Sequence, residues 1–522
     1  MPVEIPAQLN ITSWCLDQPA DTHPERIAIQ GEPAPVTYGG LRALTNRVGN
    51  ALVASGVRRG DRILLAMADS AEFIAAFLGA AKIGAIAVPV NPFARAGDYS
   101  YWLKDSSASV ALVSGAATEE FRRAWEAVES RCPAIGVHGK HEGTTAEAAA
   151  GWRAWERWLA GAPAELEACD TAATDPAFFL YTSGSTGEPK AAVHQHKDML
   201  VTTQCFARDV MKIGPGDRTF SVSKLFFAYG LGNGLYFPLA AGASTILNPE
   251  RPKPEQVLQM VAKYRPTIFY SVPTFYSALL QAAEKGTPAD LSSVRLAVSA
   301  GEALPVEIFE RFKKRFGLEI LDAIGSTEML HMFIANRPGQ IRPGSCGTPL
   351  EHYGTRIADE GGSEVPTGEI GNLWVQGQSA FSHYWNKPEA TRRAQRDGWV
   401  LTGDKFYRDA DGCYFYCGRA DDMLKVSGLW VSPNEVENAL LAHPAVSEAA
   451  VVGRTDENGL TRAVAYLVLK PPFAGGADLA GEIRAFVRGR LASYKCPQAL
   501  VFATEIPKTA TGKIQRFRLR EP

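Results

Sequence analysis

The sequence lacks any strong excess of charge and any dense pattern of cysteine. Lysine and arginine number 54 against 56 aspartates and glutamates, which gives a formal net charge of -2. A balance this even gives no sign of binding to nucleic acid or to an anionic membrane. The eight cysteines are scattered through a long chain, unlike those of a small secreted disulfide scaffold, so they favour a reducing cytoplasm.

Segments that would export or anchor the chain are also lacking. The N-terminal stretch MPVEIPAQLNITS has neither the basic region nor the apolar core of a signal peptide, and the C-terminal FRLREP resembles no lipidation or organelle signal. The longest apolar run, residues 73–90, is interrupted by Lys82 and several glycines, which argues against a membrane-spanning helix. We therefore expect a soluble cytoplasmic protein without a membrane partner.

What the sequence does contain is an alternation of short β-branched runs with segments of helical periodicity. Runs such as RILLAM (62–67), VALVS (110–114) and TIFYSV (267–272) each adjoin a stretch with apolar residues three or four positions apart. Because parallel strands need helical crossovers, this pattern predicts an α/β fold with largely parallel sheets. The length of 522 residues predicts two or three domains.

The pattern changes twice towards the C-terminus. From about residue 344, Gly or Pro recurs every few positions, which predicts a β-rich subdomain over residues 344–420 within an N-terminal domain of residues 1–420. After the motif GRADD, amphipathic helices and strands return, so residues 421–522 are predicted to form a small α+β domain. The alanine-rich stretch 146–168 is predicted to be helical.

The segment Tyr181–Lys190, YTSGSTGEPK, combines small residues, hydroxyl groups and a lysine. Small side chains let backbone N–H groups approach an anion, hydroxyls add donors, and Lys190 adds positive charge, so the segment has what a phosphate-binding loop requires. A Ser/Gly surface loop is the alternative interpretation. The nucleotide-hydrolase pattern GxxxxGK[ST] is absent.

This loop and four further motifs resemble, in the same order, the signatures of the adenylate-forming superfamily, which contains acyl-CoA synthetases, nonribosomal-peptide adenylation domains and firefly luciferases. The resemblance spans essentially the whole chain and implies a large N-terminal domain, a hinge and a small mobile C-terminal domain. It also implies ATP and CoA as co-substrates and Mg²⁺ as a cofactor. The four motifs are SAGEALP (299–305), IGSTE (324–328), TGD (402–404) with GRADDMLKVSG (418–428), and PKTATGKIQR (507–516).

The resemblance implies catalytic roles for Lys513, Thr327, Glu328 and Lys190. Glu328 and Thr186 would hold Mg²⁺, and Lys513 would offset charge repulsion when a carboxylate attacks the α-phosphate. Without the resemblance, each charged residue would be interpreted as an ordinary solvated or turn residue. The residues implied to contact the nucleotide are Thr182, Ser183, Gly184, Ser185, Thr186, Gly187, Gly301, Glu302, Ala303, Asp322, Ile324, Gly325, Asp404 and Arg419.

A second half-reaction would need a thiol. No cysteine lies in a motif that suggests a covalent nucleophile, so the thiol is expected from outside the chain, and the resemblance supplies coenzyme A. Asp421 matches the hinge of the superfamily, and Ser427 and Gly428 would border the tunnel for the pantetheine arm. The alternative is that GRADD is only a charged interdomain turn.

Residues 224–239 and 325–336 resemble the corresponding stretches of benzoate-CoA ligases and imply a pocket for the acid. Flat aromatic walls would suit a planar ring. His331 could neighbour the substrate carboxylate or a ring substituent, or it could be a core histidine. The residues implied to line the pocket are Phe227, Ala228, Tyr229, Phe237, Gly325, His331 and Met332.

Two pairs of residues with metal-ligating side chains are interpreted as structural. Cys413 and Cys417 supply only two thiols and have no histidine pair nearby in the sequence. His194 and His196 follow the phosphate-loop segment, but a lone HxH pattern is more often structural than metal-binding.

We therefore expect an aromatic acid:CoA ligase that converts ATP, acid and CoA into aroyl-CoA, AMP and diphosphate through an aroyl-adenylate. The acid is expected to be benzoate or a substituted benzoate such as anthranilate. The alternatives are a stand-alone adenylation enzyme that loads a carrier protein, a fatty-acyl-CoA ligase, a luciferase-like monooxygenase and a nonenzymatic sensor. No nucleic-acid partner is expected, and the oligomeric state, with a homodimer as one outcome, is left open.

Overall fold

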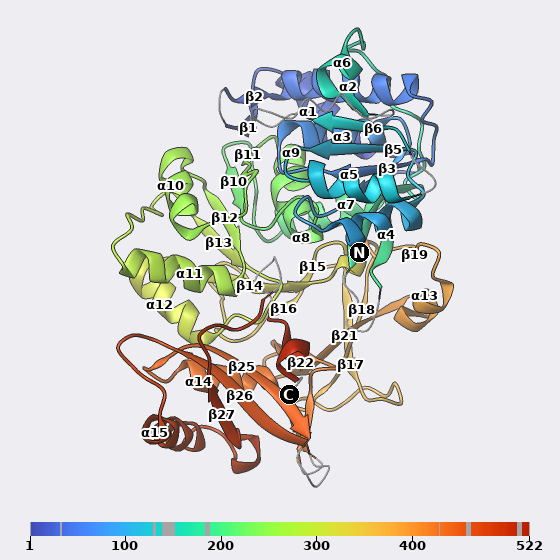
Figure 1. Ribbon diagram of the computed structural model, residues 1–522. Helices are drawn as coiled ribbons and strands as arrows, with labels where there is room; N and C mark the ends of the chain where they lie inside the picture. Colours follow the sequence, from blue (N-terminus) through green and yellow to red (C-terminus); the bar gives the residue numbers. More distant parts are fainter. Residues whose placement is uncertain are drawn as a thin grey trace.

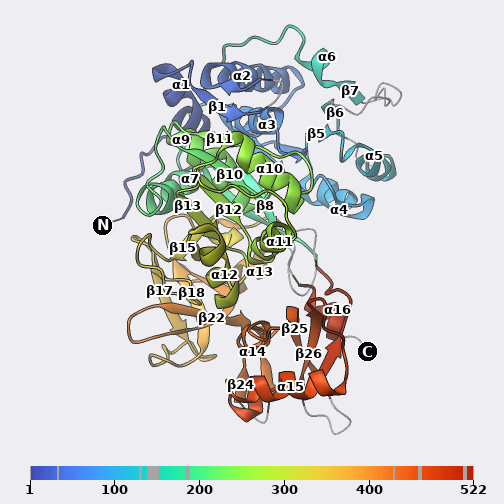
Figure 2. The same ribbon diagram turned by 90° about the vertical axis from the view of Figure 1, so that its left-hand side faces the viewer.

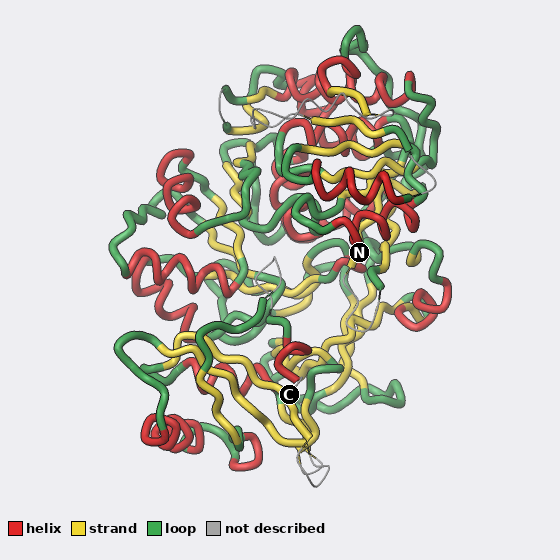
Figure 3. Tube along the Cα trace, viewed as in Figure 1, coloured by secondary structure: helices red, strands yellow, loops and turns green. Residues whose placement is uncertain are grey.

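The computed structural model describes residues 2–31, 34–128, 132–137, 152–182, 188–426, 429–455, 461–508 and 514–520. Figures 1 and 2 show the N-terminal segments at the top of the molecule and the C-terminal segments, in orange and red, at the bottom. Figure 3 shows strands in layers with helices along their faces. This mixed α/β architecture is the one that the sequence predicts.

Within the described residues, eight strands form the first large sheet. In sheet order they are β19 (His383–Tyr384), β9 (Lys190–Gln195), β8 (Pro176–Thr182), β4 (Ile86–Pro89), β3 (Arg62–Ala66), β5 (Val110–Ser114), β6 (Ala134–Val137) and β7 (Trp152–Ala154). The strands from β4 to β7 are parallel, whereas β9 is antiparallel to β8. In β3, Ile63 and Leu65 join one hydrophobic core while Leu64 and Ala66 join another, as expected for a parallel strand that is covered on both faces.

Nine of the described strands form the second large sheet. In sheet order they are β16 (Thr348–Pro349), β15 (Met332–Ala335), β14 (Ile320–Gly325), β13 (Leu296–Ser299), β12 (Ile268–Ser271), β10 (Arg218–Ser221), β11 (Ser244–Ile246), β1 (Ile27–Gln30) and β2 (Val36–Thr37). The strands from β14 to β1 pair in parallel, and antiparallel strands close both edges.

Helices bury their apolar sides against both sheets. Phe73 and Phe77 of α3 share one core with Leu65 of the first sheet and Val298 of the second, so the two sheets pack around common helices. Fully burying each phenylalanine contributes roughly 1.5–3 kcal/mol. The helices of the N-terminal part are α1 (Gln18–Thr22), α2 (Tyr38–Ala54), α3 (Ala71–Lys82), α4 (Ala96–Ser106), α5 (Thr118–Ala127), α6 (Trp155–Leu159), α7 (His196–Thr202), α8 (Ala228–Leu231), α9 (Phe237–Ala240), α10 (Pro254–Tyr264), α11 (Pro273–Glu284) and α12 (Val306–Phe316).

Residues 344–420, where the sequence predicts a β-rich subdomain, supply strands to three sheets. Most of their strands form an antiparallel sheet of their own: β17 (Gly354–Ala358), β18 (Gly371–Gln376), β20 (Gln395–Arg396), β21 (Trp399–Arg408) and β22 (Tyr414–Arg419). However, β16 pairs with β15, and β19 pairs with β9. The helix α13 (Pro388–Ala394) follows β19. This segment is therefore interleaved with both large sheets.

The C-terminal residues have their own sheet and core. Val451 and Leu467 pack with Leu440 and Ile483 in a core that joins this sheet to α14 and α15. The side-chain amide of Gln281 in α11 donates to the hydroxyl of Ser447 (3.4 Å), which links this part to the N-terminal part. The elements are β23 (Leu424–Val426), β24 (Leu429–Val431), α14 (Pro433–Leu441), β25 (Val446–Thr455), β26 (Thr461–Leu469), α15 (Ala477–Arg488), β27 (Ala499–Phe502) and α16 (Arg516–Arg520).

The prediction of a helix over residues 146–168 is wrong for the described part of that stretch. Among residues 152–168, which the structure describes, only Trp155–Leu159 is helical. The amides of Asn46 and Asn50 in α2 donate to carbonyl groups of residues 163–165, which holds these residues in a non-helical conformation. The apolar run 73–90 is divided between α3 and β4. Nowhere in the described chain is a helix both long and apolar enough to cross a membrane.

Gly347 permits a close approach between backbone segments. Its φ is +87°, and an added Cβ would lie 2.2 Å from the carbonyl carbon of Ala335. Gly56 is a matched control because its φ is +86° but no atom lies within 4 Å of the Cβ position. We expect Gly347→Ala to destabilise the fold by at least ~2 kcal/mol, since overpacking adds to the backbone strain, and Gly56→Ala by only ~1 kcal/mol. Thermal unfolding of both variants measures this difference, and equal shifts would contradict it.

Candidate active site

The centre of the candidate site is the 3₁₀ helix Thr327–Met329, which follows β14. Gly325 ends β14, and an added Cβ there would lie 2.3 Å from the carbonyl oxygen of His331, so the close approach of β14 and β15 requires glycine. The backbone N–H of Phe381 donates to the carbonyl of Glu328 (2.7 Å). The turn that carries Glu328 is thus fixed from both sides.

Tyr384 connects Glu328 to Lys190. The Tyr384 hydroxyl donates to Oε1 of Glu328 (2.6 Å), and Nζ of Lys190 lies 4.9 Å from the centre of the tyrosine ring, within cation–π range. The pairing of β19 with β9 brings these distant segments together. Burial and the Glu328 carboxylate raise the pKa of Tyr384, so its hydroxyl stays protonated and donates.

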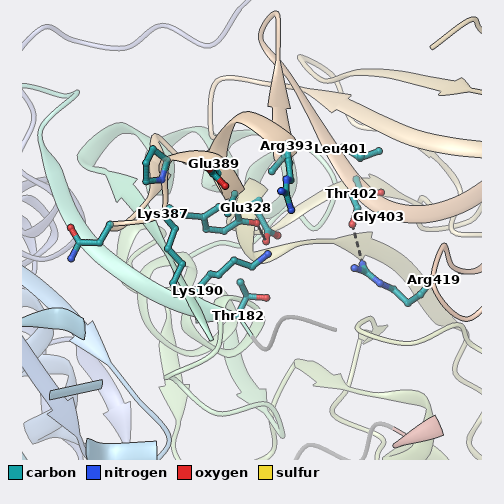
Figure 4. Close-up of a pocket in the computed structure, with 15 residues that line it drawn as sticks. Thr182, Lys190, Glu328, Lys387, Glu389, Arg393, Leu401, Thr402, Gly403 and Arg419 are labelled. Carbon is teal, nitrogen blue, oxygen red and sulfur yellow. Dashed lines mark hydrogen bonds between the residues drawn. The ribbon is translucent and has the colours of Figure 1, made fainter. Parts of the chain in front are cut away.

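These side chains line a pocket of about 750 Å³. Figure 4 shows Lys190, Glu328 and Arg393 pointing into it, with Arg419 reaching in from β22. Cations outnumber carboxylates along the walls, which suits a polyanion such as a chain of phosphates. Arg393 has no hydrogen-bond or ion-pair partner among the described residues. The lining residues are Thr182, Lys190, Glu328, Tyr384, Asn386, Lys387, Pro388, Glu389, Ala390, Arg393, Ala394, Leu401, Thr402, Gly403 and Arg419.

Asp404 and Arg419 form an ion pair at one end of the pocket. They face each other across β21 and β22, and Nη1 of Arg419 lies 3.0 Å from Oδ1 of Asp404. The same nitrogen donates to the carbonyl of Thr402 (3.0 Å). Gly403 has a φ of +74°, and a Cβ there would lie 2.8 Å from the guanidinium group. Glycine at position 403 therefore leaves room for the Arg419 side chain beside the buried carboxylate of Asp404.

Asp322 on β14 is a second buried carboxyl group, next to the SAGEALP turn. It is 5% exposed, and its Oδ1 has no hydrogen-bond partner within the part of the chain that the structure describes. Burial raises the pKa of Asp322 well above its usual range. The turn itself bends at Gly301, whose φ is +89°. A buried polar atom without a partner is costly, so this position suits a polar ligand group.

Glu328 is the carboxylate best placed to bind a metal ion. Its Oε1 accepts from Tyr384, while its Oε2 has no partner among the described residues. In that part of the chain, no group of three or more His, Cys, Asp or Glu side chains could hold a metal. One carboxylate combined with phosphate oxygens and water is the donor set that Mg²⁺ prefers. Glu328 therefore fits an ion shared with a nucleotide.

The residues predicted to form the acid pocket include a buried aromatic cluster around His331. The imidazole ring lies 4.5 Å from Phe237, 5.5 Å from Phe206 and 5.7 Å from Tyr229, centre to centre. Its Nε2 lies 3.2 Å from Oδ1 of Asn233, which can only accept, so Nε2 carries the proton. Burial lowers the pKa of His331 to about 3, so the ring is neutral at physiological pH.

Other residues of the predicted acid pocket lie beside this cluster. Met332 faces Gly325 across β15 and β14, and Ala228 begins α8 directly before Tyr229. Phe227 precedes α8, and its ring contacts that of Phe226, with 4.0 Å between centres.

Several predicted site residues lie outside the described residues: Ser183, Gly184, Ser185, Thr186, Gly187, Ser427, Gly428 and Lys513. Conversely, no motif pointed to Tyr384, Lys387 or Arg393, which line the pocket. The only sequence signal for them is a cluster of aromatic and basic residues shortly before the TGD motif.

The sequence matches known families along most of its length. The AMP-binding enzyme family matches residues 16–385, and the AMP-binding enzyme C-terminal domain matches residues 435–513. The chain belongs to the AMP-binding enzyme family. The superfamily resemblance that the five motifs predict is thereby confirmed.

Individual members of this family are similar over nearly the whole chain. The benzoate–CoA ligase of Thauera aromatica is 44% identical over 486 residues, which cover 93% of this chain and 90% of that protein. The structure of the anthranilate CoA ligase AuaEII in complex with anthranoyl-AMP superposes with a TM-score of 0.94 at 39% identity, covering 99% of this chain and 97% of that chain. For a benzoate CoA ligase from Burkholderia xenovorans LB400, the TM-score is 0.90 at 41% identity, with 98% and 100% covered. The predicted fold class is confirmed.

The environment of His331 predicts that its ring does not titrate in the physiological range. Its folded pKa of about 3 lies below the unfolded value of 6.5, so the neutral form persists as the pH falls until the solution becomes strongly acidic. We expect the His331 resonance of histidine-labelled protein to stay unchanged between about pH 5.5 and 8. Free histidine added to the sample titrates over this range and serves as the control. Assignment by His331→Gln identifies the signal, and a shift with a midpoint near neutrality would contradict the prediction.

Proposed function

We propose that this protein is an aromatic acid:CoA ligase, which activates a benzoate-type acid as its adenylate and transfers the aroyl group to CoA. The observation that carries the proposal is the cationic pocket in which Lys190 and Glu328 share one cavity with Arg419. The benzoate and anthranilate ligases to which the chain is similar favour a planar aromatic acid. Their similarity to this chain extends over both its N-terminal and its C-terminal part. It therefore supports both half-reactions, adenylate formation and thioester formation.

The nucleotide would lie along the ends of β13, β14 and β21. Asp404 is proposed to accept both ribose hydroxyls, with Arg419 orienting its carboxylate. The unpartnered Oδ1 of Asp322 suits the amino group of adenine, which needs a buried acceptor. Ile324 and residues 301–303 would contact the faces and edge of the ring.

The first half-reaction brings anions together, because an acid carboxylate attacks the α-phosphorus while the bond to diphosphate breaks. Lys190 is proposed to neutralise the phosphate chain, and Thr182 and Thr327 to donate to phosphate oxygens. Lys190 and Thr182 both line the pocket. Lys513 is proposed to lie at the attacking and bridging oxygens. Fixed cations in a pocket that excludes water stabilise such charge more strongly than water does.

Glu328 and Thr186 are proposed to hold Mg²⁺ with the phosphates. The ion would neutralise phosphate oxygens when it is bound. The hydrogen bond from Tyr384 keeps the Glu328 carboxylate turned into the pocket, which limits the reorganisation needed on binding.

The second half-reaction needs a thiol from outside the chain. All eight cysteines are free, but burial raises the pKa of Cys15, Cys205, Cys346 and Cys417, so these thiols are poor nucleophiles. CoA is the proposed acceptor, with Ser427 and Gly428 beside the pantetheine arm. Free thiols on a chain of this size also support a cytoplasmic location.

Asp421 is the proposed hinge between the half-reactions. On its N-terminal side, Arg419 bonds to Thr402 and Asp404, and the N–H of Ala420 donates to Gly403 (2.9 Å). On its C-terminal side, the carboxylate of Asp422 pairs with Arg516 and Arg520. A rotation of the small domain would therefore have its pivot between these two anchored positions, which supports the assignment.

The acid is proposed to be benzoate or a substituted benzoate. Tyr229, Phe237 and neutral His331 offer aromatic contacts to a planar ring, and none of these side chains supplies a positive charge. The charged half of the site would therefore receive the carboxylate, and the aromatic half the ring.

A panel of acids tests the function. With ATP and Mg²⁺, we expect diphosphate release with benzoate, anthranilate or hydroxybenzoates but little with cyclohexanecarboxylate or medium-chain fatty acids. With CoA and no carrier protein, aroyl-CoA should accumulate. Failure of every acid to release diphosphate would refute the ligase, whereas a fatty-acid preference would refute only the acid pocket. Adenylate without aroyl-CoA would favour a carrier-loading enzyme.

Lys513→Ala is expected to separate the half-reactions. Loss of the cation should slow aroyl-adenylate formation by at least about 100-fold, because it would stabilise charge in that transition state. Thioester formation from supplied aroyl-adenylate should be far less affected. Lys508→Ala is the control, since Lys508 is already paired with Glu448 at 2.7 Å. Rapid-quench assays of each half-reaction measure the effect, and equal losses in both would contradict the role of Lys513.

A further inference from the structure

His194 connects the two large sheets directly beneath the candidate site. It lies near the end of β9 and is 0% exposed, and its Nε2 is 2.8 Å from the carbonyl oxygen of Thr327. A carbonyl oxygen can only accept, so Nε2 donates. The hydrogen bond ends on the residue directly before Glu328, which places it within one peptide unit of the pocket.

The other ring nitrogen faces a buried carboxylate. Nδ1 of His194 lies 2.9 Å from Oδ2 of Asp198, which is also 0% exposed. That carboxylate accepts from the backbone N–H of Gln195 (2.9 Å) and from the ammonium group of Lys197 (3.0 Å), which hold it in place. The ring is thus held at both nitrogens, by Thr327 at Nε2 and by Asp198 at Nδ1, and Asp198 fixes its orientation.

Lys190 and His194 act from the same strand. They are four positions apart on β9, so their side chains project from the same face of the sheet. Phe178 stacks on the imidazole, with ring centres 5.2 Å apart and planes at 17°. Stacking on Phe178 therefore fixes the plane of the His194 ring, and the contacts at its two nitrogens fix its rotation within that plane.

We propose that His194, oriented by Asp198, is a positioning residue for adenylate formation, which holds the turn carrying Thr327 and Glu328 in register with Lys190. This inference rests on the proposed function, because it assigns Thr327 and Glu328 to the phosphates and the metal ion. The hydrogen bond sets where the turn lies relative to β9, and a displaced Glu328 would reach a shared ion less well. Residues that do not bind a metal themselves but hold a metal-binding residue in place typically contribute 10- to 100-fold to metal affinity or activity.

Two conservative variants separate this role from simple core packing. Asparagine at position 194 can replace the Nδ1 contact with Asp198 but cannot reach Thr327, whereas glutamine places its amide near the position of Nε2. We expect His194→Asn to slow acid-dependent ATP–diphosphate exchange by about 10- to 100-fold and to raise the Mg²⁺ concentration for half-maximal rate. His194→Gln should recover most of the rate. Thioester formation from supplied aroyl-adenylate should stay near the wild-type rate in both variants.

His196→Asn is the matched control. This histidine is also buried on the same segment, but its Nδ1 accepts from the backbone N–H of Ile11, and its Nε2 has no hydrogen-bond partner among the described residues. Even if the His196→Asn variant loses thermal stability, we expect the ratio of its two half-reaction rates to equal that of the wild type. Equal rates in His194→Asn and His194→Gln, parallel loss of both half-reactions, or an unaltered exchange rate in His194→Asn would each overturn the proposal.

A spectroscopic measurement tests the geometry without turnover. In protein labelled with ¹⁵N-histidine, Nε2 of His194 should show the shift of a protonated nitrogen, and Asp198→Asn should change the Nδ1 signal. An unprotonated Nε2 would overturn the hydrogen bond to Thr327 and with it the proposal. If the wild-type protein releases no diphosphate with any acid, the proposed function fails, but this measurement still reports on the His194 geometry.

Discussion

The hydrogen bond between His194 and the carbonyl of Thr327 joins the two large sheets at the point where the pocket forms. β9 belongs to one sheet, and the turn after β14 belongs to the other. Two further bonds cross the same junction, since the N–H of Phe381 and the hydroxyl of Tyr384 both reach Glu328. The pocket is therefore a product of how the sheets meet, and neither sheet could present Glu328 and Lys190 together on its own.

Two neighbouring parts of the structure contrast in polarity, the charged pocket and the buried aromatic cluster around His331. On one side, Lys190, Arg393 and Arg419 face the cavity with few carboxylates to balance them. On the other, His331 is neutral because burial lowers its pKa to about 3, and its neighbours are aromatic rings. In the proposed function, the phosphates would bind in the charged pocket and the planar ring beside the aromatic cluster, with the acid carboxylate at the boundary between them.

The sequence predicts the sheets and much of the charged half because both leave local signals. Short β-branched runs identify the strands, and motifs such as TGD identify Asp404 beside Arg419. No motif identifies the contribution of Tyr384, because it depends on a two-residue strand that pairs with β9 across a long stretch of sequence. His194 is recognisable as a structural histidine, but its partners belong to different elements. The helix predicted over residues 146–168 fails because contacts with Asn46 and Asn50 override local propensity.

With Asp421 as the proposed hinge, the anchoring on either side of it would let one pocket serve two successive reactions. Arg419 is tied to the TGD strand, so it would stay with the nucleotide whichever way the small domain turns. Asp422 is tied to Arg516 and Arg520 of the C-terminal helix, so it would move with that domain. Rotation of the small domain between these two anchors would turn a different face of that domain towards the pocket. Neither set of ion pairs would break. The energetic cost of rotation would then fall on the remaining contacts between the two parts, such as the one between Gln281 and Ser447, and a single hydrogen bond between such side chains contributes only about 1 kcal/mol.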